Sequence, residues 1–251
     1  MKKKAVAVVM TAVMALGMVS AVSVQAGIED KTLIVGFDAE YPPYGYMDEN
    51  GEYTGFDLEL AQAVCDLEGW ELEKKPINWD SKDMELNSGS IDCIWNGFTM
   101  NGREDDYTFS EPYVDNSQVI VVADDSGIEK LTDLAGKTVG VQAASAALDL
   151  LQSEEEGGQK ELADTFGALN EFADYNTAFT ELQAGALDAL AIDVGVAKYQ
   201  LNSRGEGFKI LDETLNTEQY AIGFKKGNTE LCDIVNADLQ KLPDYSYRPI
   251  T

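Results

Sequence analysis

The sequence contains no histidine, and this absence removes several classes of function. Ser-His and Cys-His catalysis and most zinc sites need an imidazole. Cysteine is also scarce, since Cys65, Cys93 and Cys232 stand far apart among apolar residues, without the paired spacing of metal ligands. We expect them to be small buried side chains, although Cys65 and Cys93 could instead form a disulfide in an oxidising compartment.

Basic side chains are few as well. The chain has 18 Lys and Arg against 45 Asp and Glu, a formal net charge of −27. A surface this acidic repels phosphates, so nucleic acid is not expected as a partner. It concentrates cations, which favours a basic solute.

Long hydrophobic runs are absent except at the N-terminus. Three Lys precede an apolar run from Ala5 to Val24, and Val24-Gln25-Ala26 is typical of a signal-peptide cleavage site. We therefore predict a signal peptide over residues 1–26 and export to the periplasm or the cell surface. A membrane anchor is the alternative, because the run is nearly long enough to span a bilayer. A lipid-anchored form would need Cys where Gly27 stands.

A unit of strands and helices occurs twice, about a hundred residues apart, which suits two lobes of similar size. Residues 31–38 and 137–142 have the same short, apolar strand pattern. Residues 86–94 and 182–190 both predict a helix end, a Gly and a buried strand, with the same Gly-to-Asp spacing. Helical periodicity fills the interval in each half. The repeated order predicts, in each lobe, a mostly parallel sheet with helices on both faces.

The chain crosses between the predicted lobes twice. We place the first lobe at residues 27–117 and 221–251 and the second at 118–220. Extended segments at 116–122 and 219–224 would then form a hinge that lets the lobes close. In open sheets ligands bind beyond the carboxyl ends of the strands, so residues 38–44, 96–99, 142–145 and 192–194 are the candidates.

Aromatic residues follow two of these strand ends. Tyr41 and Tyr44 enclose two prolines that hold the loop rigid. Trp79 precedes Asp80, which we expect to be the N-cap of the next helix. Two such rings could enclose a ligand side chain or stack on a cationic one, and burial in the core is the alternative.

Three polar residues suit a small zwitterion. Arg103 can bind a carboxylate through two parallel hydrogen bonds, although the acids that follow it could instead make it a surface ion pair. Ser145 lies between a strand and a helix, where it could bind an anion or serve as a helix cap. Asp193 follows a buried strand and could pair with an ammonium group or lie in solvent.

These features together resemble a known family. The motifs are Gly36-Phe37-Asp38-Ala39-Glu40-Tyr41-Pro42-Pro43-Tyr44, Gly55-Phe56-Asp57-Leu58, Ile91-Asp92-Cys93-Ile94-Trp95-Asn96-Gly97-Phe98-Thr99, Phe109-Ser110-Glu111-Pro112-Tyr113 and Leu187-Asp188-Ala189. From about Lys31 to Leu242 they are similar to the polar amino-acid branch of the bacterial extracellular solute-binding proteins, family 3. The resemblance implies a two-lobed, type II periplasmic-binding-protein fold and delivery of a free polar or basic amino acid to the permease of an ABC importer. It implies a monomer with no catalytic residue, metal or cofactor.

The resemblance also implies a role for each candidate. Tyr41 and Trp79 resemble the rings around the ligand side chain, and Asp38 a polar contact at its end, with Gln142 within reach. The carbonyl of Gly97, with Thr99 beside it, resembles the acceptor for the α-amino group, and Asp193 resembles the partner of that group. Arg103 and Ser145 resemble the groups that bind the α-carboxylate.

Two features depart from this pattern. The loop before Arg103 is one residue shorter than in many relatives. Relatives continue past Leu242 into a further helix, whereas this chain ends at Thr251, and we interpret its end as truncated or frame-shifted. The alternative functions are a dehydratase-like enzyme on the same fold, which would need a positioned proton donor, and a ligand-sensing domain.

Overall fold

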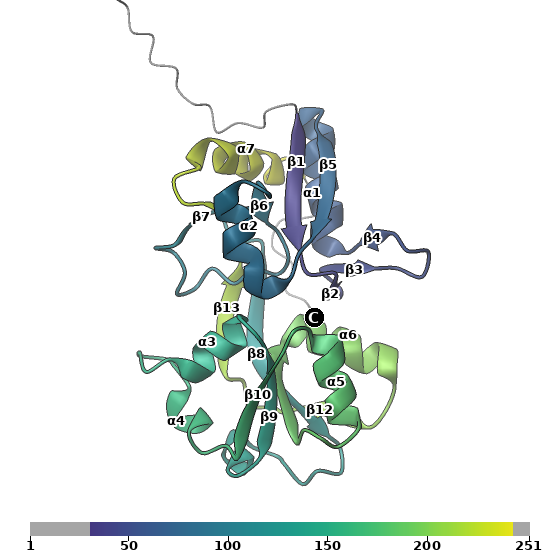
Figure 1. Cartoon of the computed structure of the whole chain (residues 1–251), viewed down its shortest axis with the longest axis vertical. Helices are drawn as coiled ribbons and strands as arrows, with labels where there is room; N and C mark the ends of the chain where they lie inside the picture. Colours follow the sequence, from purple (N-terminus) through teal and green to yellow (C-terminus); the bar gives the residue numbers. More distant parts are fainter. Residues whose placement is uncertain (1–30, 243–251) are drawn as a thin grey trace, which may run out of the picture.

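The computed structural model describes residues 31–242, so the predicted signal peptide and the chain end after Leu242 lie outside the described residues. Two lobes lie one above the other, each a sheet with helices around it (Figure 1). Strands β8 and β13 run between the lobes (Figure 1). This is the predicted two-lobed α/β architecture.

The upper lobe in Figure 1 has a five-stranded sheet in the order β5-β1-β6-β14-β7. Its strands are β1 (Thr32–Phe37), β5 (Glu71–Pro76), β6 (Cys93–Ile94), β7 (Tyr107–Phe109) and β14 (Gly223–Lys225). Its helices are α1 (Phe56–Glu68), α2 (Lys82–Ser88) and α7 (Thr229–Leu239), with a 3₁₀ turn at Trp79–Ser81. Strands β2 (Glu40–Tyr41), β3 (Gly45–Met47) and β4 (Tyr53–Thr54) form a small sheet of their own.

The lower lobe has a six-stranded sheet in the order β10-β9-β11-β8-β12, with β13 also paired to β8. Its strands are β8 (Val114–Ala123), β9 (Thr138–Gln142), β10 (Ala168–Phe172), β11 (Ala189–Asp193), β12 (Phe208–Ile210) and β13 (Asn216–Tyr220). Its helices are α3 (Ala146–Gln152), α4 (Lys160–Ala163), α5 (Tyr175–Gln183) and α6 (Val194–Arg204), and a 3₁₀ turn spans Leu131–Leu134.

Both sheets are mixed rather than mostly parallel. In each, the strands of the repeat are parallel, β1 with β5 and β6, and β9 with β10 and β11. The strands that carry the chain between the lobes pair antiparallel, as β8 does with β11, β12 and β13. The strand that crosses between the lobes is antiparallel to the strands of the repeat, and the repeat alone does not predict this direction.

Alternation along the strands divides the core into layers. Leu33 and Val35 of β1 pack into one apolar cluster with helix α1, while Ile34 lies against another that contains Leu86 of α2. Strand β8 likewise places Val121 in the first cluster and Ile120 in a cluster with α3. Helices therefore cover both faces of each sheet, as predicted.

The repeated Gly and Asp residues perform the same tasks in both lobes. A Cβ on Gly36 would lie 2.4 Å from Ile91, and one on Gly140 would lie 2.5 Å from Leu187, so a side chain at either position would displace the packed neighbour. The carboxylate of Asp92 accepts a hydrogen bond from the N–H of Ile34, and that of Asp188 accepts one from the N–H of Thr138, each at 2.8 Å. The repeated Gly and Asp residues are thus explained by the same close packing and the same backbone hydrogen bond in each lobe.

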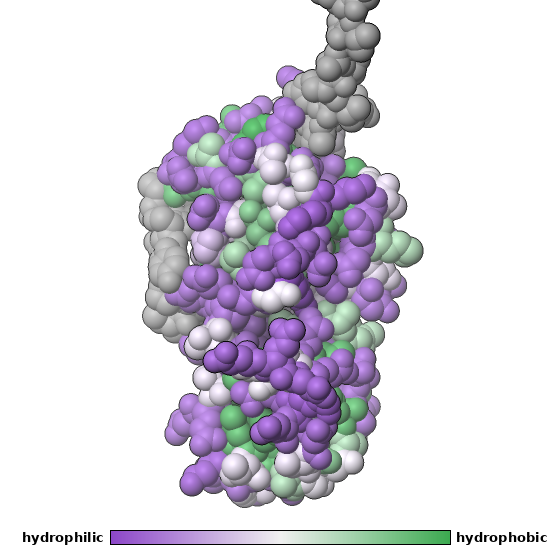
Figure 2. Space-filling model, turned by 90° about the vertical axis from the view of Figure 1, so that its left-hand side faces the viewer, coloured by the Kyte–Doolittle hydropathy of each residue, from purple (hydrophilic) through white to green (hydrophobic). Residues whose placement is uncertain are grey.

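Two smaller expectations are decided by the structure. All three cysteines are free and buried. The expectation that Asp80 caps the following helix is wrong, because the chain enters α2 through the 3₁₀ turn and Ser81 occupies the N-cap position. Hydrophilic residues cover most of the face shown in Figure 2, in keeping with the acidic composition.

Candidate functional site

The candidate site lies between the lobes, where β1, β6, β9 and β11 end. Eight of the nine predicted site residues line one small cavity there, together with Ala146; they are Tyr41, Trp79, Gly97, Thr99, Arg103, Gln142, Ser145 and Asp193. Asp38, the ninth, is bonded to one of them, because the Gln142 amide Nε2 donates to its carboxylate at 2.6 Å. The fold therefore brings together residues from five separate segments of the chain.

The lobes are closed on each other. The cavity holds about 10 Å³, roughly enough for one water molecule, so a larger ligand needs the lobes to separate. Side chains of the two lobes are in contact around it: Lys82 Nζ donates to the carbonyl of Ala144 at 3.2 Å, and Asn176 donates to the carboxylate of Glu40. Opening would break these bonds along with the bond between Asp38 and Gln142.

Asp193 is the most strongly bonded of the predicted residues. It ends strand β11 with 3% of its surface exposed, which rules out a solvated loop acid. The Tyr220 hydroxyl and the Gln118 amide each donate to its Oδ1 at 2.6 Å, and the Asn116 amide does so at 2.8 Å. Burial raises the pKa of Asp193, and the bond from Tyr220 partly offsets that rise.

A second buried acid, Glu218, lies beside it. The amides of Gln118 and Asn116 also donate to Glu218 Oε1, both at 2.8 Å, and the Thr99 hydroxyl does so at 2.7 Å. Burial raises the pKa of Glu218, and so does the charge of Asp193. The site thus holds two carboxylates that share the same two donors.

The Gly97 peptide is fixed by a buried carboxylate. Its N–H donates to Asp57 Oδ2 at 2.5 Å, and Asp57 is fully buried at the start of α1. Burial raises the pKa of Asp57 to about 7. Gly97 has φ of +55°, and a Cβ there would lie 2.9 Å from the Tyr41 ring. Glycine therefore suits this position, and its N–H is already bonded to Asp57.

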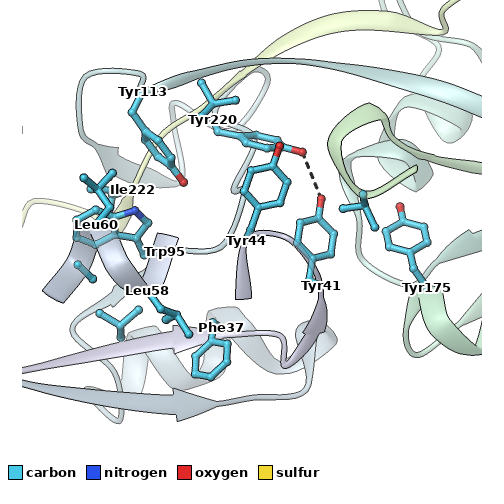
Figure 3. Close-up of a cluster of buried hydrophobic side chains, with 14 of the residues drawn as sticks. Phe37, Tyr41, Tyr44, Leu58, Leu60, Trp95, Tyr113, Tyr175, Tyr220 and Ile222 are labelled. Atoms are coloured by element: carbon cyan, nitrogen blue, oxygen red, sulfur yellow. Dashed lines mark hydrogen bonds between the residues drawn. The ribbon is translucent and has the colours of Figure 1, made fainter. Parts of the chain in front are cut away.

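Tyrosine rings border the site. The Tyr41 hydroxyl lies 3.3 Å from that of Tyr220, and Figure 3 shows the Tyr44 hydroxyl turned toward the same point. The ring of Tyr175 from the lower lobe lies 6.0 Å from that of Tyr41. Tyr41 is thus both part of the core and part of the cavity lining, so the two interpretations of the sequence do not exclude each other.

Arg103 and Ser145 also have structural partners. Arg103 Nη2 forms a 2.6 Å salt bridge to Asp149 of the other lobe, and the guanidinium lies 5.0 Å from the centre of the Phe98 ring. Ser145 Oγ accepts from the N–H of Leu148 at 3.2 Å and so caps α3. The Arg103 ion pair therefore joins the lobes and does not involve the neighbouring acids that the sequence suggested.

An acidic cavity adjoins the site at Asp38. It has a volume of about 640 Å³, and Asp38 and Trp79 are part of its wall. Its other acidic lining residues are Glu40, Asp80, Glu85 and Asp174, and no Lys or Arg among residues 31–242 lines it. Burial raises the pKa of Asp38 to about 6. A cationic group in this cavity would meet several carboxylates.

Sequence reasoning missed five residues of the site: Asp57, Asn116, Gln118, Glu218 and Tyr220. Asp57 stands within a motif of the resemblance but was given no role. Asn116 and Gln118 alternate along the predicted crossover strand, and Glu218 and Tyr220 alternate along its partner. Polar residues at every second position of a strand otherwise rich in Val and Ile were the available signal.

The described residues lack two other kinds of feature. Over residues 31–242, no group of three or more Cys, Asp or Glu side chains is placed to hold a metal ion. No helix within the same range has the length and apolar character needed to cross a bilayer.

Comparison with known proteins agrees with the fold and the site. Residues 33–248 match the family model of the bacterial extracellular solute-binding proteins, family 3. The chain is 34% identical over 218 residues to the arginine-binding extracellular protein ArtP of Bacillus subtilis, covering 85% of this chain and 82% of ArtP. It is 30% identical to the L-cystine-binding protein TcyJ of Escherichia coli, covering 91% and 88%. A histidine-bound substrate-binding protein of an ABC uptake transporter from Streptococcus pneumoniae superposes with a TM-score of 0.79 at 34% identity, covering 84% and 87%.

Proposed function

Because the chain belongs to the bacterial extracellular solute-binding proteins, family 3, we propose that it captures an amino acid with a cationic side chain. It is a binding protein that serves an ABC importer and is not an enzyme. Members of the family act outside the cytoplasm, and a cleaved signal peptide, a monomeric state and the absence of a lipid anchor are part of our proposal for this chain. The division into residues 27–117 with 221–251 and residues 118–220 is also proposed.

The cavity offers partners for both charges of an amino acid. Asp193 supplies the anionic partner for the α-ammonium group, with the Gly97 carbonyl and Thr99 hydroxyl beside it. Arg103 and Ser145 supply donors for the α-carboxylate. The observation that carries the proposal is that these groups from two lobes border one cavity. A single lobe could not surround the ligand in this way.

The side-chain end decides the class of amino acid. Relatives at similar identity are named for arginine and cystine, and a solved structure at similar identity has histidine bound, so overall similarity does not select among them. Asp38 lies at this end, with the rings of Tyr41 and Trp79 on the cavity wall and the acidic cavity beyond. A guanidinium can stack on such rings and pair with Asp38. We therefore propose arginine, with lysine as the next choice.

A thermal-shift series tests this proposal. Melting of the purified protein is measured with arginine, lysine, histidine, cystine, glutamine and glutamate, because a ligand that binds only the folded state raises the melting temperature. We expect arginine to give the largest rise. A selective rise with glutamate would contradict the proposed cationic class, and a folded protein indifferent to all amino acids would contradict the proposed function.

Asp38→Asn is expected to weaken arginine binding ten- to a hundredfold, since hydrogen bonds to charged groups contribute about 1.5 to 3 kcal/mol. Glutamine affinity is expected to change less, because an uncharged amide can bond with either side chain. Isothermal titration calorimetry measures both affinities. Asp105→Asn, which neutralises an exposed acid of the same lobe, is the matched control. If the affinities for arginine and glutamine fall by the same factor, Asp38 does not distinguish ligands by the charge of their side chains.

Arg103→Ala and Asp149→Asn separate two roles of the Arg103 guanidinium. The salt bridge joins Arg103 to a carboxylate whose side chain is 61% exposed, so its loss alone should weaken binding by at most about fivefold. Removing the guanidinium also removes the proposed carboxylate anchor and should weaken binding by more than about tenfold. If titration calorimetry finds the two variants equally weak, Arg103 acts only by holding the lobes together.

A further inference from the structure

Asp193 of the cavity wall shares its amide donors with Glu218, which lies behind it and lines the adjoining grooves, and this pair suggests a function beyond holding the ligand. We infer that Glu218 is a second anionic residue of the binding site, and that the α-ammonium group of the ligand takes the place of a proton that Asp193 and Glu218 share in the unliganded protein. This inference rests on the proposed function. It adds Glu218 to the binding site as a positioning residue and predicts that amino-acid capture releases a proton.

The sheet holds the two carboxylates in register. Asp193 of β11 is paired with Gln118 of β8, and Glu218 of β13 is paired with Asn116 of the same strand. Asn116 and Gln118 are two residues apart and so project to the same face of the sheet. Strand β8 therefore presents two amides between a carboxylate on one neighbouring strand and a carboxylate on the other.

The hydrogen bonds bring the acids close to each other. The Gln118 amide Nε2 lies 2.6 Å from Asp193 Oδ1 and 2.8 Å from Glu218 Oε1. The Asn116 amide Nδ2 lies 2.8 Å from each of the same two oxygens. Two acids whose oxygens share both nitrogens are close neighbours. Both side chains are buried, so their repulsion is poorly screened and they do not ionise independently.

No cation in the described part of the chain neutralises the pair directly. Neither carboxylate forms a salt bridge with a Lys or Arg among residues 31–242. Arg103 borders the cavity but is bonded to Asp149, and Lys82 borders the larger space outside it. Lys198 and Glu218 both line a further groove. The remaining titratable groups around the pair are the hydroxyls of Tyr41, Tyr44, Tyr175 and Tyr220, whose pKa values burial holds well above the ordinary range.

Two buried amide oxygens agree with a site built for a cation. Asn116 Oδ1 and Gln118 Oε1 have no hydrogen-bond partner, although both atoms are buried. The NH₂ groups of the two amides donate to the carboxylates, and the amide oxygens remain without a donor. Buried acceptors without donors are unfavourable unless a donor arrives. The ligand ammonium carries three N–H donors, so it matches a site that has an excess of acceptors.

The proton balance follows from charge. Burial raises the pKa of both acids, and the charge of Asp193 raises that of Glu218 further. Together with the shared donors, these shifts lead us to place one proton on the pair without ligand, which gives it a net charge of −1. An ammonium group beside Asp193 lowers both pKa values, and the proton leaves to solvent. Binding that releases a proton strengthens as the pH rises, by up to about tenfold per pH unit. Above the pKa of the unliganded pair this dependence ends.

Asp38 would contribute in the same direction. Its pKa is about 6, and a guanidinium beside it would favour its charged form. The two sources are separated by measuring proton release in the Asp38→Asn protein, where only the pair can contribute. Glu218→Gln in that background should then reduce the release, because one of the two carboxyl groups that share the proton is gone.

Titration calorimetry with L-arginine, in two buffers of different ionisation heat between pH 5 and pH 8, counts the protons. We expect Asp38→Asn to release up to one proton per ligand, with an affinity that rises with pH. The Asp38→Asn, Glu218→Gln protein should release much less, and Glu171→Gln, which neutralises an exposed acid, should leave the release unchanged. Thermal melting checks that each variant folds, and arginine binding without proton release in the wild-type protein would overturn the inference with no substitution at all.

The outcomes distinguish the two hypotheses. Arginine binding without proton release in the Asp38→Asn protein at any pH would overturn this inference while leaving the proposed function intact. Release that survives Glu218→Gln undiminished would also overturn it. No binding heat with arginine or with any other amino acid of the thermal-shift series, from a protein that melts cooperatively, would contradict the proposed function itself.

Discussion

Asp193→Asn is expected to abolish measurable amino-acid binding while leaving the unliganded protein at least as stable as before. Removing one partner of a buried, hydrogen-bonded charge pair costs about 2 to 5 kcal/mol, which corresponds to a loss of roughly thirtyfold to several thousandfold in affinity. The substitution keeps the size of the side chain. It replaces a buried acid, whose ionisation burial disfavours, with a neutral side chain, so the unliganded fold should not lose stability.

Two measurements check this expectation. Titration calorimetry gives the affinity, and thermal melting at pH 7 gives the stability with and without ligand. Asp212→Asn changes an exposed acid of the same lobe and should alter neither quantity. If Asp193→Asn binds within about threefold of the wild type, Asp193 is not the partner of the ammonium group. A large fall in melting temperature without ligand would instead mean that its main role is to hold β8, β11 and β13 together.

The fold could be predicted from the sequence because its repeat has a local physical cause. Gly36 and Gly140 lie where a Cβ would meet a packed side chain, and Asp92 and Asp188 bind the backbone of a neighbouring strand. These constraints act at matching positions in both lobes, so the pattern is visible without a structure. The predicted site residues were chosen because they follow the repeated strands, and eight of the nine line one cavity.

The part of the site contributed by the hinge could not be predicted in the same way. Glu218 meets Gln118 and Asn116 only because β8 and β13 pair antiparallel across about a hundred residues, and their register depends on the whole lower lobe. The second crossover was expected at 219–224, and the chain passes there from β13, which ends at Tyr220, to β14, which begins at Gly223. Glu218 lies just before this segment and was therefore not considered. Arg103 was likewise compared with its neighbours in sequence and not with Asp149, which lies on the other lobe.

The predicted N-cap of α2 was wrong for a reason that lies in the adjoining residues. Asp80 was expected to begin the helix after Trp79 because a short acid before an apolar pattern commonly does so. The chain instead makes a 3₁₀ turn through Trp79, Asp80 and Ser81 before α2 starts at Lys82. This turn places Trp79 at the cavity wall and Lys82 within reach of Ala144 on the other lobe. The start of α2 is therefore tied to a contact between the lobes, which a local sequence pattern does not show.

Gly97→Ala is expected to weaken amino-acid binding by more than tenfold and also to lower stability. The residue has φ of +55°, where an L side chain costs about 1 to 2 kcal/mol. The added methyl group would lie 2.9 Å from the Tyr41 ring and 3.0 Å from the Tyr220 ring, so one ring must move. Overpacking of this kind costs about 1 to 3 kcal/mol more. Together these terms should lower the melting temperature by several degrees.

Gly89→Ala separates the two causes. Gly89 has φ of +77° at the end of α2, and a Cβ there would have no atom within 4 Å, so this variant carries the backbone strain alone. It should lose stability without losing affinity, whereas Gly97→Ala should lose both, because its clash moves the rings that border the cavity and turns the carbonyl proposed to receive the α-ammonium group. Thermal melting and titration calorimetry on the two variants distinguish these results. Equal affinities would mean that the Gly97 peptide lies outside the ligand's reach and that its contact with Asp57 serves the fold alone.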